Sequence, residues 1–339
     1  MTSPTQPGPL PQPGPLTQPG GLPQPIPAAP PCSTTARERG DPLAGSAAPA
    51  TRWLLIEHPG PWSETALGSR PLDGPVGARL ATAAAAAGAR ILLVRRPWVV
   101  HRAAPRAWAV VDHHQGIRWG HWDDVTDLSR AGEAVGATVA PQGHQGPLVL
   151  VCVHARHDTC CAVRGRPVAA ALSRRWPDQT WQCSHLGGDR FAANVLVIPD
   201  GTTYGQVEAE DAVALVGGHL RGHVDPTHLR GMSTHPPMVQ AAVVDAMTRW
   251  GPARPGDLEV LSVQQVRAEE WELVLDGPPL PAATMRATVT RRRRPGAVLT
   301  CRATAMASAD EYAVRWWAAP DGSSVRRRDP PPGGTRAAW

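Results

Sequence analysis

Four of the six cysteines in this 339-residue chain lie close together in the sequence with three histidines. The stretch "VCVHARHDTCCAVRG" (151–165) holds three of these cysteines and two of the histidines, and "WQCSHLGGDRF" (181–191) adds one of each. Thiolates and imidazoles are the side chains that bind iron and zinc, and thiolates also carry disulfide chemistry. The clustering therefore indicates a metal site or thiol redox chemistry.

Two C-x-H pairs stand out within these stretches, Cys152 with His154 and Cys183 with His185. Residues two apart on a strand point to the same face, so each pair can present one sulfur and one nitrogen to a single centre. Two cysteines and two histidines suit tetrahedral zinc, although the spacing is not a common zinc-finger pattern. A structural zinc module is therefore one interpretation of the site.

Adjacent cysteines, Cys160 and Cys161, are expected in the loop before a helix, where backbone N–H groups and the helix dipole lower a thiol's pKa. A thiol-disulfide enzyme using these two residues is a second interpretation. Against it, a disulfide between adjacent cysteines closes a strained ring, and thioredoxins use C-x-x-C. Cys32 and Cys301 stand alone in the sequence and are expected to be ordinary structural cysteines.

The elements that hold these residues follow from the hydrophobic pattern. Residues 146–154 are apolar enough for a central strand, and a helix is expected over 165–176 with a proline near its first turn. A short strand (180–185), a hairpin turning at 199–201 and helices over 208–220 and 236–250 follow. The order strand, helix, strand, hairpin, helix resembles a thioredoxin-like fold.

The flanking segments also have distinct patterns. Residues 32–145 are expected to form an N-terminal α/β half with strands at 52–60, 90–96, 106–114 and 117–124. A small antiparallel sheet is expected in 253–325, with strands at 258–266, 270–275, 283–292 and 297–305 and with Arg291–Arg294 in a solvated turn. The repeats of "QPGPL" in 1–31 predict a disordered arm, and 326–339 a frayed tail.

Composition narrows the possible partners and location. All 34 basic residues are arginine against 29 acidic ones, so the formal charge of +5 gives only weak attraction to acidic partners, and no nucleic-acid partner is expected. No apolar run approaches the roughly 18 residues of a membrane helix, so no membrane association is expected. The opening "MTSPTQPGPLPQ" lacks a secretory pattern, which favours the cytoplasm, where disulfides are rare.

Longer motifs resemble one known family. "VCVHARHDTCCAVRGRPVAAAL", "WQCSHLGGDRFAANVLVIPDGTTYGQV", "WLLIEHPGPWSETAL" and "CSTTARERGDPLAGSA" are similar to the sucrase/ferredoxin-like family, over roughly residues 32–250. The resemblance implies a thioredoxin-like ferredoxin domain at 146–252. The expected fold is therefore α/β, with this domain between the N-terminal α/β half and the small C-terminal sheet.

The resemblance also implies a ligand set. In the best-understood members a [2Fe–2S] cluster is held by cysteines in a C-x8-C spacing and histidines in an H-x3-H spacing. Cys152 and Cys161 match the first spacing, with Cys160 one position short, and His185 matches the first histidine. The second histidine position is occupied by Asp189, which departs from the pattern.

The fourth ligand is therefore open among Asp189, Cys183 and His154. We narrowly favour Cys183, because sulfur is the softer and commoner partner for iron. Gly187 and Gly188 allow the backbone to approach a cluster closely, and Arg190 would offset some of its charge. These three residues are the expected cofactor-binding contacts outside the ligands.

The favoured hypothesis is a cytoplasmic electron-transfer protein, a carrier more than a catalyst, with one [2Fe–2S] cluster and an unidentified redox partner protein. It needs no nucleophile and no substrate pocket, and the chain shows neither clearly. The alternatives remain the Cys160/Cys161 thiol-disulfide enzyme, the structural zinc module and a binding module without a metal.

Overall fold

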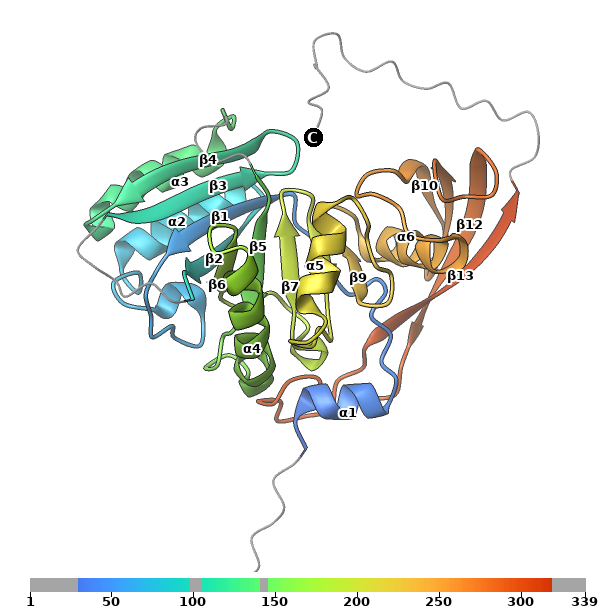
Figure 1. Ribbon diagram of the computed structural model, residues 1–339, viewed down its shortest axis with the longest axis horizontal. Coiled ribbons are helices and arrows are strands. Elements are labelled where there is room, and N and C mark those ends of the chain that lie inside the picture. Colours follow the sequence, from blue (N-terminus) through green and yellow to red (C-terminus); the bar gives the residue numbers. More distant parts are fainter. Residues whose placement is uncertain (1–29, 98–104, 141–145, 319–339) are drawn as a thin grey trace, which may run out of the picture. The chain divides into compact units, whose positions relative to one another are not determined.

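A computed structural model describes residues 30–97, 105–140 and 146–318. The expected arm lies outside these residues except for Pro30 and Pro31, and the expected tail (326–339) lies wholly outside them. The described residues form two β-sheets with helices (Figure 1). The mixed α/β class predicted from the sequence is therefore confirmed.

The larger sheet has nine strands in the order β4-β3-β1-β2-β6-β5-β7-β8-β9. These strands are β1 (Arg52–Glu57), β2 (Ala89–Arg95), β3 (Arg106–Asp112), β4 (Gly116–Trp122), β5 (Leu148–Cys152), β6 (Thr180–Cys183), β7 (Val195–Ile198), β8 (Thr202–Tyr204) and β9 (Leu229–Met232). The helices of the described residues are α1 (Cys32–Glu38), α2 (Pro75–Ala86), α3 (Ser129–Gly136), α4 (Thr159–Arg175), α5 (Ala212–Leu220) and α6 (Pro237–Trp250), with short 3-10 turns η1 (Ala66–Gly68), η2 (Val125–Leu128) and η3 (Asp189–Phe191).

The large sheet consists of two units with the same topology. In the first, β1 and β2 are parallel and joined through α2, β3 is antiparallel to β1, and β4 is antiparallel to β3. In the second, β5 and β6 are parallel and joined through α4, β7 is antiparallel to β5, and β8 is antiparallel to β7. This order is that of a thioredoxin-like fold, so the expectation for the second unit is confirmed and the first unit repeats it.

The two units meet at equivalent strands, because β2 pairs with β6 in antiparallel register at Val94↔Cys183 and Arg95↔Gln182. The expected halves at 32–145 and 146–252 therefore share one sheet, while their limits as domains stay a prediction. Only the second unit carries cysteines, since the sequence has none between Cys32 and Cys152. The cysteines of the predicted ligand set thus belong to one of two similar units.

Strand β5 contributes to both packed faces of the sheet, as the two-residue period of a strand requires. In β5, Val149 and Val151 belong to a hydrophobic cluster with side chains of α2 to α6. Leu148, Leu150 and Cys152 belong to a second cluster on the other face. All five residues are buried and β5 lies inside the sheet, which confirms the predicted central strand.

Helix α4 begins six residues before the predicted start, so the expectation that Cys160 and Cys161 lie in a preceding loop is wrong. Asp158 caps the helix, since its side chain accepts a hydrogen bond from the backbone N–H of Cys160 at 2.8 Å. Both cysteines then lie in the first turn, and Pro167 lies inside the helix. The proline was mistaken for a first-turn residue because prolines are most common there.

The small sheet has four antiparallel strands, as predicted: β10 (Glu259–Arg267), β11 (Glu270–Asp276), β12 (Thr284–Arg293) and β13 (Asp310–Ala318). The fourth strand was predicted at 297–305, which is wrong, because that segment makes only an isolated bridge from Ala297 to Ala307. The sequence "DEYAVRWWA" pairs with β12 instead, since its aromatic and branched side chains suit a strand.

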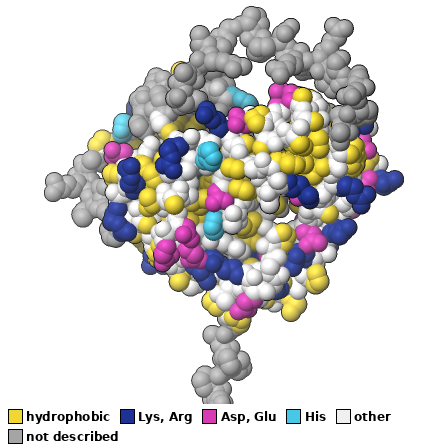
Figure 2. Space-filling view, turned by 45° about the vertical axis from the view of Figure 1, so that its right-hand side comes forward, with side chains coloured by type: hydrophobic (Ala, Val, Ile, Leu, Met, Phe, Trp, Pro, Cys, Tyr) yellow, Lys and Arg dark blue, Asp and Glu magenta, His cyan; other side chains and the backbone are white. Residues whose placement is uncertain are grey.

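The predicted arginine turn is also wrong, because Arg291–Arg293 end strand β12. Arg291 lies against Glu269, and Arg293 lies 3.5 Å from Asp310. On the face shown in Figure 2, basic and acidic side chains are likewise interspersed. None of the helices among the described residues is long and apolar enough to cross a membrane.

Candidate metal centre

Three predicted ligands converge at one end of the second unit. Cys152 ends β5, Cys161 lies in the first turn of α4, and His185 follows β6. Their sulfur and nitrogen atoms lie within 4.8 Å of one another. Asp189 joins them, with its Oδ1 atom 3.3 Å from Cys161 Sγ and 2.9 Å from His185 Nδ1. We term Cys152, Cys161, His185 and Asp189 the Cys152 cluster.

The close approach of α4 to β5 depends on Gly165. A Cβ atom at this position would lie 2.0 Å from the backbone oxygen of Cys152, which no side chain can tolerate. The helix therefore packs directly on the end of the strand, and this brings the Cys161 sulfur to the Cys152 sulfur. A glycine inside a helix costs conformational entropy, so its presence here reflects the contact.

The two thiols of the cluster differ in acidity. A hydrogen bond from the Cys161 thiol lowers the pKa of Cys152, burial opposes this, and backbone N–H groups of His154 and Leu186 lower it further. The same hydrogen bond, with burial, raises the pKa of Cys161. Cys152 is therefore the first thiolate of the pair, already surrounded by donors that stabilise a negative sulfur.

Asp189 is a buried carboxylate that stays ionised. Burial raises its pKa, but a hydrogen bond and the charge interaction with His185, followed by the hydrogen bond from Cys161, lower the pKa below its ordinary value. Its side chain is only 2% exposed, whereas that of His185 is 29% exposed. The cluster therefore has an anionic inner side and an imidazole at its solvent edge.

His154 lies beside the Cys152 cluster, and both of its ring nitrogens already have hydrogen-bond partners. Its Nε2 atom lies 2.5 Å from the backbone oxygen of Ser63, and its Nδ1 atom accepts from the backbone N–H of His185 at 3.2 Å. Since a carbonyl oxygen only accepts, the ring is neutral with its proton on Nε2. Burial lowers its pKa, in agreement with the neutral form.

His157 is a residue that the sequence analysis missed. Its Nδ1 atom donates to the backbone oxygen of Glu64 at 3.2 Å, which leaves the Nε2 lone pair free. That Nε2 atom lies 3.7 Å from Asp189 Oδ2, and the ring stacks on His185 with centroids 3.7 Å apart. In the sequence, the H-x2-H spacing of His154 and His157 after Cys152 could have indicated a second histidine beside the Cys152 cluster.

The loop between His185 and Asp189 is held by Arg230, a second residue that the sequence did not suggest. Arg230 lies in β9 and is 1% exposed. Its Nη1 atom donates to the backbone oxygen of Gly187 and to Asn194 Oδ1, at 2.8 Å each. Its Nη2 and Nε atoms bind the backbone oxygen and the hydroxyl of Ser46. One buried cation thus fixes the ligand loop against the N-terminal segment.

Gly187 and Gly188 have positive φ angles of 89° and 73°, as the expected close backbone approach requires. A Cβ atom at Gly188 would meet Arg230 Nη2 at 2.3 Å, so this glycine makes room for the arginine. Arg190 lies with its Nε atom 3.2 Å from Asp41 Oδ2 and stacks on Phe191. The cofactor contacts expected of these residues stay a prediction.

The two remaining candidate ligands lie elsewhere. Cys183 is fully buried and pairs across the sheet with Cys152, but within the described residues it joins no group of converging ligand atoms. Cys160 faces away from the Cys152 cluster and lies 3.7 Å from the Cys32 sulfur and 3.3 Å from the Cys301 sulfur. The expectation that Cys32 and Cys301 are isolated is therefore wrong.

The fold and the site together define a thioredoxin-like unit with a cysteine- and histidine-containing centre. The chain belongs to the sucrase/ferredoxin-like family, whose model, described as "Sucrase/ferredoxin-like", matches residues 43–231. The matched segment contains all four members of the Cys152 cluster and Arg230. Among curated proteins no match is found.

Among solved structures, the chain is similar to a thioredoxin-like [2Fe–2S] ferredoxin from Aquifex aeolicus. The sequences are 27% identical, and the match covers 22% of this chain and 81% of that chain, with a TM-score of 0.20. The likeness is thus restricted to a small part of the chain.

The donor set of the Cys152 cluster fits an iron–sulfur centre. Two thiols, of which Cys152 has a lowered pKa, supply soft ligands for iron, and His185 supplies an imidazole at the solvent edge. Asp189 is a harder ligand, but its carboxylate is ionised and buried, and its Oδ1 atom lies 3.3 Å from the Cys161 sulfur. The residues present are therefore compatible with a metal cofactor.

Proposed function

We propose that this protein transfers single electrons through one [2Fe–2S] cluster held by Cys152, Cys161, His185 and Asp189. The observation that carries the proposal is the convergence of two buried thiols and a partly exposed imidazole, from three separate parts of the chain, within 4.8 Å. A [2Fe–2S] cluster supplies a one-electron couple whose potential depends on its ligands and their hydrogen bonds.

The chain's own residues prepare the site for such a group. Cys152 is the more acidic thiol, and backbone N–H groups of His154 and Leu186 donate to its sulfur. Hydrogen bonds to cluster sulfurs are a common means of raising the potential. Arg230 holds the loop from His185 to Asp189, so two of the four ligands keep a fixed separation.

Asp189 is favoured as fourth ligand over Cys183, which reverses the preference from the sequence. Asp189 Oδ1 lies 3.3 Å from Cys161 Sγ and 2.9 Å from His185 Nδ1, and Asp189 is grouped with His185 and His157, whereas Cys183 joins no group of ligand atoms in the described part of the chain. His157 is the next candidate, because its free Nε2 atom points toward Asp189. With Asp189 as the fourth ligand, the iron–sulfur cluster would be held by two cysteines, one histidine and one carboxylate.

The exposed edge of His185 is the expected approach for a redox partner protein, since the two cysteines are buried. The cytoplasm suits six free cysteines, because thiols stay reduced there. The thiol-disulfide alternative loses support, since the Cys160 and Cys161 sulfurs belong to different groups. Electron transfer therefore remains the function that the site supports best.

The proposal is tested on protein purified without oxygen. A brown protein that contains iron and sulfide in equal amounts, and that bleaches on reduction and recovers on reoxidation, is the expected result. A colourless protein without sulfide would contradict it. Reduction of a protein disulfide substrate by the iron-free chain would instead favour the thiol-disulfide enzyme.

A further inference from the structure

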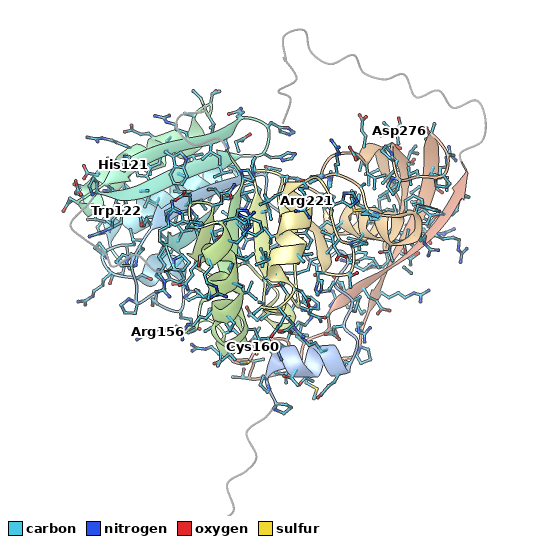
Figure 3. The ribbon with its side chains drawn as sticks, in the orientation of Figure 1. His121, Trp122, Arg156, Cys160, Arg221 and Asp276 are labelled. Carbon is cyan, nitrogen blue, oxygen red and sulfur yellow. The ribbon has the colours of Figure 1, made fainter. Side chains whose placement is uncertain are left out.

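A second group of cysteines lies on the other side of the first turn of α4. Cys32 opens α1, Cys160 is in α4, and Cys301 is in the segment between β12 and β13. Figure 1 shows that segment beside α1 and the lower end of α4, and Figure 3 shows Cys160 at that end, next to α1. Three parts of the chain, each more than 120 residues from the next, thus meet at three sulfur atoms.

The three sulfurs form a nearly regular triangle. Its sides are 3.3 Å between Cys160 and Cys301, 3.5 Å between Cys301 and Cys32, and 3.7 Å between Cys32 and Cys160. Asp158 stands beside the triangle, with its two carboxylate oxygens 3.6 and 3.8 Å from the Cys32 sulfur. We term Cys32, Cys160, Cys301 and Asp158 the Cys32 cluster.

These distances are within about 0.5 Å of the edges of a zinc tetrahedron. A Zn–S bond of about 2.3 Å gives sulfur–sulfur edges of about 3.8 Å, and a Zn–O bond of about 2.1 Å gives sulfur–oxygen edges of about 3.6 Å. A disulfide would bring two sulfurs to about 2.05 Å and leave the third thiol unpaired. All four ligand atoms of the Cys32 cluster lie within 4.8 Å of one another.

We propose that the Cys32 cluster binds a zinc ion through three thiolates and the Asp158 carboxylate, as a site separate from the Cys152 cluster. The set of three sulfurs and one oxygen favours zinc, since thiolates select it and its closed tetrahedral sites are structural. The inference does not depend on the proposed electron-transfer function, because no residue is shared between the two clusters.

Asp158 is held in place for this role by the backbone. Its Oδ1 atom accepts from the N–H of Cys160 at 2.8 Å, and its Oδ2 atom accepts from the N–H of Cys301 at 2.6 Å. Each carboxylate oxygen can accept more than one bond, so a lone pair remains for a metal. Ligands whose orientation is fixed by such hydrogen bonds are typical of metal sites.

Two arginines brace the chain segments next to the cluster, although each is also paired with a glutamate, Arg164 with Glu208 and Arg302 with Glu64. Arg164 donates to the hydroxyl of Ser33 at 2.9 Å, directly after Cys32, and Arg302 donates to the backbone oxygen of Arg156 at 2.7 Å. Cys301 is exposed, which gives a metal ion access from solvent. The bound ion would fasten α1 and the segment around Cys301 to the start of α4.

The experiment measures zinc and iron together in the full chain, purified without chelators. About one zinc per chain is expected in the unaltered protein. Cys32→Ser and Cys301→Ser should each lose zinc and keep iron, while Cys152→Ser should lose iron and keep zinc. Cys183→Ser, a buried cysteine outside both clusters, is the matched control and should keep both metals.

Zinc retained in Cys32→Ser and Cys301→Ser would overturn the proposal, and so would a disulfide among the three cysteines found by intact mass and peptide mapping. If those variants fail to fold, cobalt(II) is added to the Cys152→Ser chain, in which the Cys32 cluster is intact. Absorption typical of tetrahedral cobalt with three thiolates is then expected. No thiolate-to-cobalt band would overturn the proposal.

Discussion

Cys160 and Cys161 are neighbours in the first turn of α4, yet their sulfur atoms lie in different clusters. Cys161 Sγ is 3.3 Å from Asp189 Oδ1, and Cys160 Sγ is 3.3 Å from Cys301 Sγ. Successive residues on a helix project about 100° apart, so one turn can serve two sites. The position of this turn, capped by Asp158, therefore matters to both clusters.

The fourth ligand is tested by Asp189→His. The variant should keep the cluster, because it restores the histidine of the H-x3-H spacing. Its reduction potential should rise by on the order of 100 mV, since an anionic ligand is replaced by a neutral one and histidine ligation shifts clusters from about −400 mV to roughly −150 mV or above. The potential should also become pH-dependent if an imidazole nitrogen can lose a proton. Redox titration at several pH values measures both effects.

Cys183→Ala tests the alternative fourth ligand. Because Cys183 joins no group of converging ligand atoms in the described part of the chain, its removal should leave the spectrum and potential unchanged. Loss of iron from Cys183→Ala, together with an unaltered potential in Asp189→His, would show that Cys183 is the ligand and Asp189 is not.

Gly165→Ala should push α4 away from β5. The new Cβ atom would lie 2.0 Å from the Cys152 backbone oxygen, so the helix must shift, at a cost of about 1–3 kcal/mol in the free energy of unfolding. The iron content should fall as well, because the shift of α4 moves the Cys161 sulfur away from the Cys152 sulfur. Gly136→Ala, at the end of α3 with no atom within 4 Å of its Cβ, is the control and should change stability by less than about 1 kcal/mol.

Arg230→Met should destabilise the chain and loosen the ligand loop. The variant leaves the backbone oxygens of Gly187 and Ser46 and the Asn194 side chain without their donor. Each buried group left unsatisfied costs about 1–3 kcal/mol, so a loss of at least about 3 kcal/mol is expected in denaturant unfolding. Unchanged stability would contradict the assigned role. Arg221→Met is the control variant, because it removes a guanidinium group at the C-terminal end of α5, away from the ligand loop.

Part of this site could be predicted from the sequence and part could not. Cys152, Cys161 and His185 lie close together in the sequence, and the resemblance to the sucrase/ferredoxin-like family, with its C-x8-C and H-x3-H spacings, implied them as ligands. Cys32 and Cys301 were missed because no local pattern relates residues 269 positions apart. Only the topology, which returns the segment after β12 to α1, brings them together.

Arg230 was missed for a different reason. A lone arginine in a predicted loop or strand is normally exposed, and the sequence around Arg230 does not show that its guanidinium makes four hydrogen bonds inside the protein. The fourth strand of the small sheet was misplaced because 297–305 and 310–318 both contain strand-forming residues. Pairing with β12 selects the second segment, and this depends on the partner strand.

The first thioredoxin-like unit gives a prediction on acid stability. Asp112 lies 2.7 Å from Arg52, and although burial raises its pKa, the hydrogen bonds from Arg52 and from the N–H groups of His114 and Gln115 lower it below its ordinary value. A lowered carboxyl pKa adds stability above the unfolded value of about 4, and this stability is lost as the pH falls through the folded value.

Asp112→Asn should therefore lower the free energy of unfolding by about 1–3 kcal/mol at pH 7, and the difference from the unaltered chain should shrink below about pH 3. Unfolding curves at both pH values measure this. Asp73→Asn is the control, because Asp73 is 44% exposed and its ion pair with Arg70, at 3.6 Å, is longer. A difference that stayed constant with pH would contradict the assignment.

The most direct test compares iron, sulfide and zinc in Cys160→Ser and Cys161→Ser, which differ only in which of two adjacent sulfurs is lost. The account predicts that Cys161→Ser loses iron and sulfide and keeps zinc, whereas Cys160→Ser keeps iron and sulfide and loses zinc. Iron and sulfide retained in full by Cys161→Ser would contradict the assignment of the Cys152 cluster as the [2Fe–2S] site.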